Sequence, residues 1–182
     1  MGAIVTNQIL ILTLLMIIGV VLRKVRILTD ELISGLTRLL LGLTMPCLIL
    51  YSFNLPFSPA MLASAGAVLL YSFAIHFGLI FVGLLAYCRF KPATRHVFQF
   101  STVFSNCGFV GYPVAQGVFG SIGVFYTSIF TIPFNILMWS YGVLLFTGER
   151  NLKSILRNLI NAPTIAIIVG FLMFVFSVQL PR

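Results

Sequence analysis

The sequence predicts an all-α protein that crosses a membrane several times. The chain is 60% hydrophobic and only 8% charged, whereas a soluble domain carries about 25% charged residues. Apolar runs long enough to span a bilayer, which takes about 20 residues, recur along its whole length. In addition, basic residues occur in every second loop, which is the pattern that orients membrane proteins.

Composition also excludes several other classes. The net charge of +8 does not indicate a nucleic-acid partner, because the bases lie in three short clusters between apolar runs. Only three acidic residues occur in the chain: Asp30, Glu31 and Glu149. The three cysteines, Cys47, Cys88 and Cys107, have no paired spacing, so neither a zinc site nor a disulfide framework is predicted. We expect no metal and no cofactor.

Six apolar runs account for about six expected membrane-spanning helices. They cover residues 3–22, 32–53, 60–87, 96–118, 122–146 and 161–180. The loops after the odd-numbered runs, such as "RKVRILTDE" and "RFKPATR", are basic, and those after the even-numbered runs carry no charge. Because basic loops stay in the cytoplasm, we expect a cell-membrane protein with its N-terminus outside.

Two basic features lie outside this alternation. Arg38 is the one base drawn into a run, near its cytoplasmic end, and we interpret it as a side chain that snorkels to the interface. The segment 150–160, "RNLKSILRNLI", places apolar and basic residues on opposite faces. It predicts a short helix lying in the cytoplasmic interface.

The fourth run contains the stretch "FSNCGFVGYPV", which is poorly suited to a regular helix. Asn106 lies eleven residues beyond Arg95, which is about 16 Å along a helix and therefore near the middle of the bilayer. Pro113 has no N–H to offer the preceding turn. Gly108 and Gly111 remove side-chain bulk and permit unusual backbone angles.

Two interpretations of this stretch are open. A proline kink with small residues for helix packing is common in membrane proteins. Alternatively, the helix is interrupted, and unpaired backbone at this depth is tolerated only where it is buried in protein or lines a wet cavity. Many secondary transporters build their substrate site from such a discontinuous helix. We favour the second interpretation, in which the break is the binding site.

Other polar positions within the runs carry weaker signals. Asn135 lies near the middle of the fifth run, where its amide either hydrogen-bonds a neighbouring helix or forms part of the site. His76 is the titratable group deep in the third run, and it either holds a neighbouring helix or carries a coupling proton. Asn7 and Gln8 are expected at the outer interface. Pro46 is expected to form a structural kink.

The stretch "FSNCGFVGYPV" resembles the N-x-G-x-x-G-x-P signature of the auxin efflux carrier family, the PIN-like carriers and their bacterial organic-acid permease relatives. The segments "RKVRILTDELISGLTRLLLGLTMPCLIL" and "NAPTIAIIVGFLMFVFSVQLP" extend the resemblance over essentially the whole chain.

The resemblance implies a bile-acid-symporter-like fold, in which two inverted five-span repeats each contain a fourth span broken at a proline. Residues 1–160 would form the first repeat, and residues 161–182 would form the first span of a second, truncated repeat. Substrate binding falls to Asn106, Gly108, Gly111 and Pro113 by this resemblance. A missing second repeat or a homo-oligomer partner is then expected to complete the carrier.

Three functions are compared on these grounds. The favoured one is a secondary transporter, or half of one, for small organic anions such as malonate or malate, with a proton or sodium as coupling ion. An intramembrane enzyme is disfavoured, because no run contains Asp or Glu and no catalytic spacing is present. A non-transporting membrane scaffold or inactive fragment is the remaining alternative.

Overall fold

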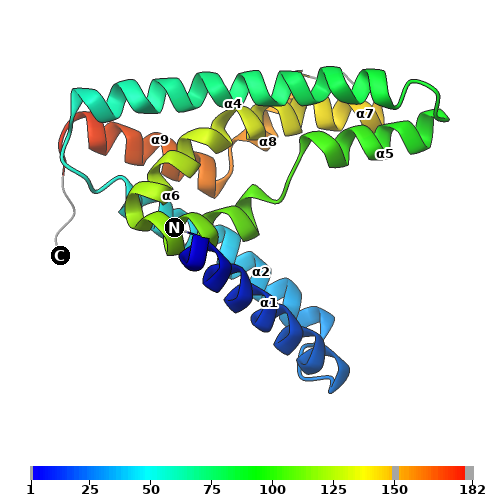
Figure 1. Ribbon diagram of the computed structural model, residues 1–182, viewed down its shortest axis with the longest axis horizontal. Helices are drawn as coiled ribbons and strands as arrows, with labels where there is room; N and C mark the ends of the chain where they lie inside the picture. Colours follow the sequence, from blue (N-terminus) through cyan, green and yellow to red (C-terminus); the bar gives the residue numbers. More distant parts are fainter. Residues whose placement is uncertain (1, 149–151, 179–182) are drawn as a thin grey trace.

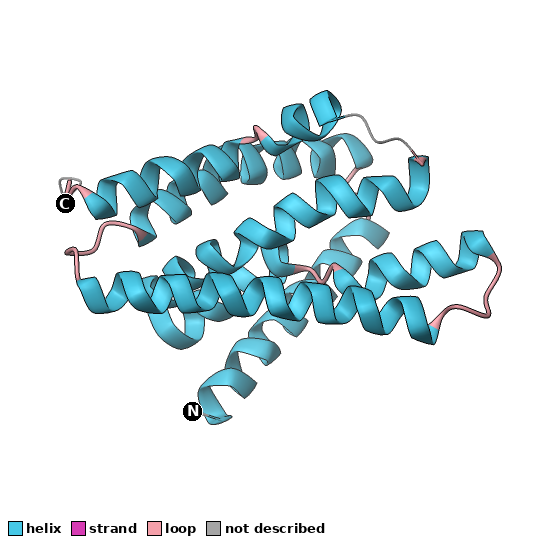
Figure 2. Ribbon diagram, turned by 90° about the horizontal axis from the view of Figure 1, so that it is seen from above, coloured by secondary structure: helices cyan, strands magenta, loops and turns pink. Residues whose placement is uncertain are grey.

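The computed structural model describes residues 2–148 and 152–178, and every regular element within those residues is a helix (Figures 1 and 2). Short π-helical segments, marked η, interrupt three of the longer helices. In chain order the elements are α1 (Gly2–Lys24), α2 (Asp30–Leu39), η1 (Leu40–Thr44), α3 (Met45–Ser52), α4 (Pro59–Ala86), α5 (Pro92–Val103), η2 (Cys107–Gly111), α6 (Tyr112–Leu137), η3 (Met138–Gly142), α7 (Val143–Thr147), α8 (Leu152–Leu159) and α9 (Ala162–Val175).

Four helical stretches are long and apolar enough to cross a membrane: Val5–Lys24, Asp30–Ser52, Pro59–Ala86 and Tyr112–Thr147. Helix α9 is also apolar but shorter. The prediction of an all-helical, multi-pass membrane protein is thereby supported, whereas the count of six spans stays a prediction. The predicted fourth run does not form one long helix, because its residues are divided between α5, η2 and the start of α6.

Helix α6 is two helices joined at a sharp bend. Gly120, in the expected loop between the fourth and fifth runs, has φ 63° and ψ −151°, a conformation that is essentially restricted to glycine. After the bend the chain doubles back closely, because a Cβ added at Gly123 would overlap the backbone carbonyl of Ala115. The fifth run therefore folds against the end of the fourth.

Local sequence explains where two of the helices begin. The Thr29 side chain accepts a hydrogen bond from the Leu32 amide at 3.2 Å, and Asp30 pairs with Arg23 at 2.6 Å across the turn before α2. Asn161 caps α9 in the same way, accepting from the Thr164 amide at 3.0 Å. These caps satisfy backbone donors that would otherwise be unpaired at the helix ends.

The buried core forms where α3, α6 and α9 meet. The rings of Phe53, Phe125 and Phe174 are fully buried and pack in edge-on and tilted pairs with centroids 5.0 and 5.2 Å apart. Gly170 of α9 allows close approach to Phe53, since an added Cβ would lie 2.7 Å from the phenyl ring. Helix α3 is therefore held tightly against α9.

A second set of contacts joins α4 to α5 and α6. Ser72 of α4 donates a hydrogen bond to the Phe130 carbonyl of α6 at 2.7 Å. Gln99 of α5 is buried and lies beside Gly83 of α4. Most apolar side chains of α1 instead point outward, as expected for a helix that faces lipid.

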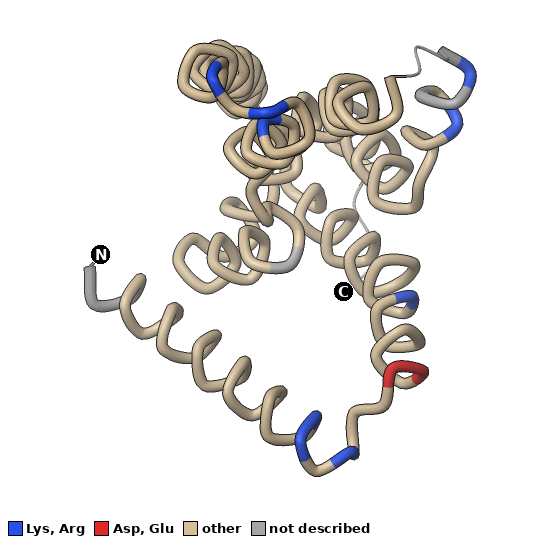
Figure 3. Tube along the Cα trace, turned by 90° about the vertical axis from the view of Figure 1, so that its right-hand side faces the viewer, with Lys and Arg blue, Asp and Glu red and all other residues tan. Residues whose placement is uncertain are grey.

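The arrangement of the turns follows the charge alternation. In Figure 1 the turns between α1 and α2 and between α4 and α5 lie toward the right, and the connection between α3 and α4 lies toward the left. Lys and Arg gather at turns and helix ends, and the acidic residues lie at the start of α2 (Figure 3). The turns after α1 and α4, which are predicted to share one side of the membrane, therefore lie toward the same side of this view.

Candidate functional site

The helix formed by the fourth run is interrupted near its middle. Helix α5 ends at Val103, and Phe104 adopts φ −107° and ψ 89°, outside the helical region. Residues 104–106 are not helical, and the chain resumes as the π-helix η2. In Figure 1 the chain leaves α5 as a loop and re-enters a helix beside α6. An interruption was expected here from the sequence.

The resemblance implied a break at the proline, but the interruption lies at other residues. Pro113 lies near the start of α6, directly after η2, in a helical segment that continues through Gly111, so its missing N–H costs one bond to the preceding turn without ending the helix. The adjoining π-helix closes with a 3.3 Å hydrogen bond from the Gly111 amide to the Asn106 carbonyl. The break is therefore seven to nine residues before the proline, at Phe104 to Asn106.

A cavity of about 270 Å³ lies against the interruption. It is formed by the break and η2, by the later part of α6 with the start of η3, by η1 with the start of α3, and by α9. Its lining residues are Leu41, Met45, Ser105, Asn106, Cys107, Gly108, Tyr112, Thr131, Phe134, Asn135, Met138, Pro163 and Ile167. Segments distant in the sequence therefore meet at the break.

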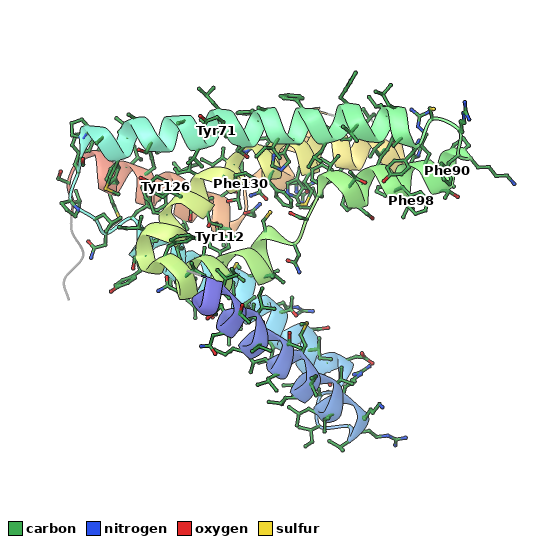
Figure 4. The ribbon with its side chains drawn as sticks, viewed as in Figure 1. Tyr71, Phe90, Phe98, Tyr112, Tyr126 and Phe130 are labelled. Carbon is green, nitrogen blue, oxygen red and sulfur yellow. The ribbon has the colours of Figure 1, made fainter. Side chains whose placement is uncertain are left out.

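A short hydrogen-bonded chain holds one wall of this cavity. The Tyr112 hydroxyl lies 3.2 Å from the Thr131 hydroxyl, which in turn donates to the Ser128 carbonyl at 2.9 Å. The Asn135 amide donates to the Thr131 carbonyl at 2.9 Å. Figure 4 shows Tyr112 at the start of α6, below Phe130 on its later part. These bonds fix the two halves of the bent helix relative to each other.

The structure brings together three of the six predicted site residues. Asn106, Gly108 and Asn135 all line the cavity. Gly111 and Pro113 belong to the same segment but are not among the lining residues. Gly108 lies close to the scaffold, since an added Cβ would be 3.9 Å from the Met45 methyl. Whether any of these residues contacts a substrate stays a prediction.

His76 lies behind the cavity and does not line it. Its ring is 2% exposed and packs at centroid distances of 5.5 and 5.9 Å from Phe130 and Phe134. His76 Nδ1 lies 2.6 Å from the Ser72 carbonyl of its own helix. Phe134, which packs on the imidazole, also lines the cavity.

Several lining residues were missed by the sequence analysis. Cys107 was considered as a metal ligand or disulfide partner and not as part of the site, although its neighbour Asn106 carried the prediction. Tyr112 and Thr131 gave no signal of their own, because polar side chains in membrane helices also serve to pack one helix against another. Met45 and Pro163 come from other helices, and no local pattern places them beside the break.

The walls of this cavity are neutral and mixed in polarity. None of its lining residues carries a formal charge, and amide, hydroxyl and thiol groups alternate with apolar side chains. In the described part of the chain no group of three or more His, Cys, Asp or Glu could hold a metal ion. Such walls can hold a small polar solute through hydrogen bonds.

A separate cavity of about 490 Å³ lies between α4 and the two arms of α6. Most of its walls are apolar, and Tyr126 and Thr127 supply its hydroxyl groups. It does not reach the interrupted segment. Its chemistry suits packing or lipid better than a polar solute, so the cavity at the break is the stronger candidate site.

Comparison with known proteins gives one match. The sequence model of a family described as membrane transport proteins matches residues 4–155. The match covers α1 to α7 and therefore includes the interrupted segment and Asn135. Neither a curated protein nor a solved structure matches the chain.

Proposed function

Since the chain belongs to the membrane transport protein family, the family of the auxin efflux carriers, we propose that it is a secondary carrier of small organic anions. The proposed substrates are malonate- and malate-like carboxylates. The family consists of transporters, not enzymes. The chain is thus a membrane transporter, and its substrate, coupling ion and orientation are the parts that need testing.

One observation supports this proposal above the others: the cavity at the interrupted helix collects amides from two spans. Asn106 comes from the break and Asn135 from the later part of α6. An amide can donate to a carboxylate and accept from backbone or from a bound ion. Backbone that leaves the helical pattern at this depth needs such a polar cavity.

The packing suggests which parts would move. Helix α4 contacts both α5 and α6 and forms one group with them, α3 packs along α9 as a second group, and α3 contacts α6 where the two groups meet. The cavity lies between these two groups, with Asn135 on one side and Met45 and Pro163 on the other. Alternating access could then follow from movement of the first group against the second.

We further propose that the protein resides in the cell membrane with its basic loops in the cytoplasm. A proton is one candidate for the coupling ion and sodium is the other. His76 would carry a proton indirectly, because it faces the cavity only through the ring of Phe134.

The test uses the full chain in lipid nanodiscs with malonate and malate as probes. Asn106→Leu keeps roughly the side-chain volume and removes every hydrogen bond of the amide. A buried partner left unpaired costs about 1–3 kcal/mol, which corresponds to about five- to more than a hundredfold weaker binding. Calorimetry should show that loss.

Asn7→Leu provides the matched control, because Asn7 is an exposed amide of α1 that does not line the cavity. It should bind the probes as the parent does. Equal binding by the parent and Asn106→Leu would make the amide a packing residue and favour the non-transporting scaffold. Uptake by cells that express each variant then separates binding from transport.

A further inference from the structure

A larger cavity adjoins the one at the break. It has a volume of about 520 Å³ and reaches from η1 and α6 to the start of α9. The two cavities share four lining residues: Leu41, Asn135, Met138 and Pro163. We call this second cavity the vestibule. Because Asn135 belongs to both, a solute in the vestibule would lie next to the interrupted helix.

Arg38 is the charged residue of this pair of cavities. It lines the vestibule, and no other described lining residue of either cavity carries a formal charge. It follows Asp30, the first residue of α2, by eight positions, which is about 12 Å along the helix. That depth places a permanent positive charge well inside the span.

In the described part of the chain, no carboxylate forms an ion pair with Arg38. The one ion pair among these residues joins Arg23 to Asp30 at the preceding turn. Arg38 is exposed in the structure, so its guanidinium is accessible to a solute that enters the vestibule. Arginine also presents a planar fork of donors that matches a carboxylate in a bidentate geometry.

The neighbouring amides are already engaged with backbone. Asn161 accepts from the Thr164 amide at 3.0 Å and donates to the Asn158 carbonyl at 3.2 Å, so it serves as a helix cap. Asn135 donates one of its two amide hydrogens to the Thr131 carbonyl and carries no charge. The Trp139 indole also lines the vestibule but carries no charge. Recognition of a charged solute here therefore falls to Arg38.

We propose that Arg38 is the anion-selecting residue of this vestibule, where it attracts a small carboxylate or similar oxyanion toward the cavity at the break. From the sequence, Arg38 was expected to reach for the interface. The structure also places it on the wall of the vestibule, whose other described lining residues carry no formal charge. The substrate class rests on the proposed function, but the local positive potential can be tested without any substrate.

Cys107 offers a native reporter, because its thiol lines the cavity at the break. Replacing Cys47 and Cys88 by alanine removes the other two thiols, both of which are exposed. The test measures how fast Cys107 reacts, in nanodiscs, with the anionic sulfonatoethyl and the cationic trimethylammonioethyl methanethiosulfonates. The ratio of the two rates reports the potential inside the cavity.

In the parent, the ratio of the anionic to the cationic reaction rate should be higher at Cys107 than at a cysteine that replaces the exposed Thr94. Arg38→Gln should lower this ratio by a factor on the order of one hundred, because one charge on the order of 10 Å away at an effective dielectric constant near 20 changes each rate by about tenfold in opposite directions. Arg38→Lys should retain most of the ratio because it retains the charge. Arg26→Gln removes an equal charge from an exposed turn and should leave the ratio unchanged.

A parent ratio no higher than that at position 94, or an unchanged ratio in Arg38→Gln, would overturn the proposal. So would a Cys107 that neither reagent reaches. If Arg38→Gln does not fold, the rate ratio in the parent and the rate ratio in Arg38→Lys still test the proposal. Added malonate should slow both reactions in the parent but not in Arg38→Gln. Absence of that protection with the charge dependence intact would contradict the proposed substrate class and leave the role of Arg38 standing.

Discussion

Gln8, near the start of α1, donates its side-chain amide to the backbone carbonyl of Pro113 at 3.3 Å. The two residues are separated by 105 positions in the chain. The absence of a side chain at Gly117 makes room for this contact, because an added Cβ there would overlap the Gln8 amide. The position of Gln8 at the outer interface stays a prediction, and its side chain ties α1 to the segment after the break.

This contact predicts a loss of stability in Gln8→Leu. The substitution leaves a partly buried carbonyl without its partner and should lower the free energy of unfolding by about 1 kcal/mol. Titration with a denaturing detergent, followed by circular dichroism, measures the change. Asn7→Leu alters the adjacent exposed amide and should cost less. Equal losses in the two variants would show that the bond to Pro113 contributes nothing.

The packing of α9 on α3 predicts opposite outcomes for two glycine substitutions. Gly170→Ala forces a methyl group against the ring of Phe53, which is fully buried. Overpacking of this kind costs about 1–3 kcal/mol. Gly66→Ala in α4 meets nothing within 4 Å, so it should stabilise the helix by about 0.5–1 kcal/mol.

The same detergent titration compares the two alanine variants. A Gly170→Ala protein as stable as the Gly66→Ala protein would mean that α9 does not pack as closely on Phe53 as the structure has it.

The position of His76 predicts the result of a coupling test. His76→Phe keeps a ring between Phe130 and Phe134 and removes the imidazole that is the candidate proton carrier. We expect anion uptake to lose its dependence on an imposed proton gradient. His96→Phe changes the other histidine of the chain and should retain that dependence. A His76→Phe protein that still responds to the proton gradient would make the imidazole a packing group.

The orientation of the chain predicts a labelling pattern. In a background without the three native cysteines, Ser58→Cys lies between α3 and α4, and Thr94→Cys lies near the start of α5. An impermeant maleimide added outside intact cells should label position 58 and spare position 94, because the adjacent loop with Arg89 and Lys91 is expected in the cytoplasm. Labelling of position 94 alone would invert the proposed topology.

The amino-acid sequence by itself determined membrane residence, helical structure and the neighbourhood of the break. These properties depend on short-range features: apolar runs of bilayer length, basic turns, and an asparagine with glycines where a helix should be regular. Asn106 and Gly108 were therefore found by reasoning along a single segment. The family was also recognisable at this level, because its signature lies within one span.

Tertiary structure alone decided which residues face the break. Met45, Thr131 and Pro163 come from three different helices, and their meeting at Asn106 depends on how those helices cross and rotate. The same dependence left Gly111 and Pro113 outside the cavity and brought Arg38 into the adjoining vestibule. A helix turns by about 100° per residue, so small changes in packing select a different face. A linear pattern in a uniformly apolar span does not encode that choice.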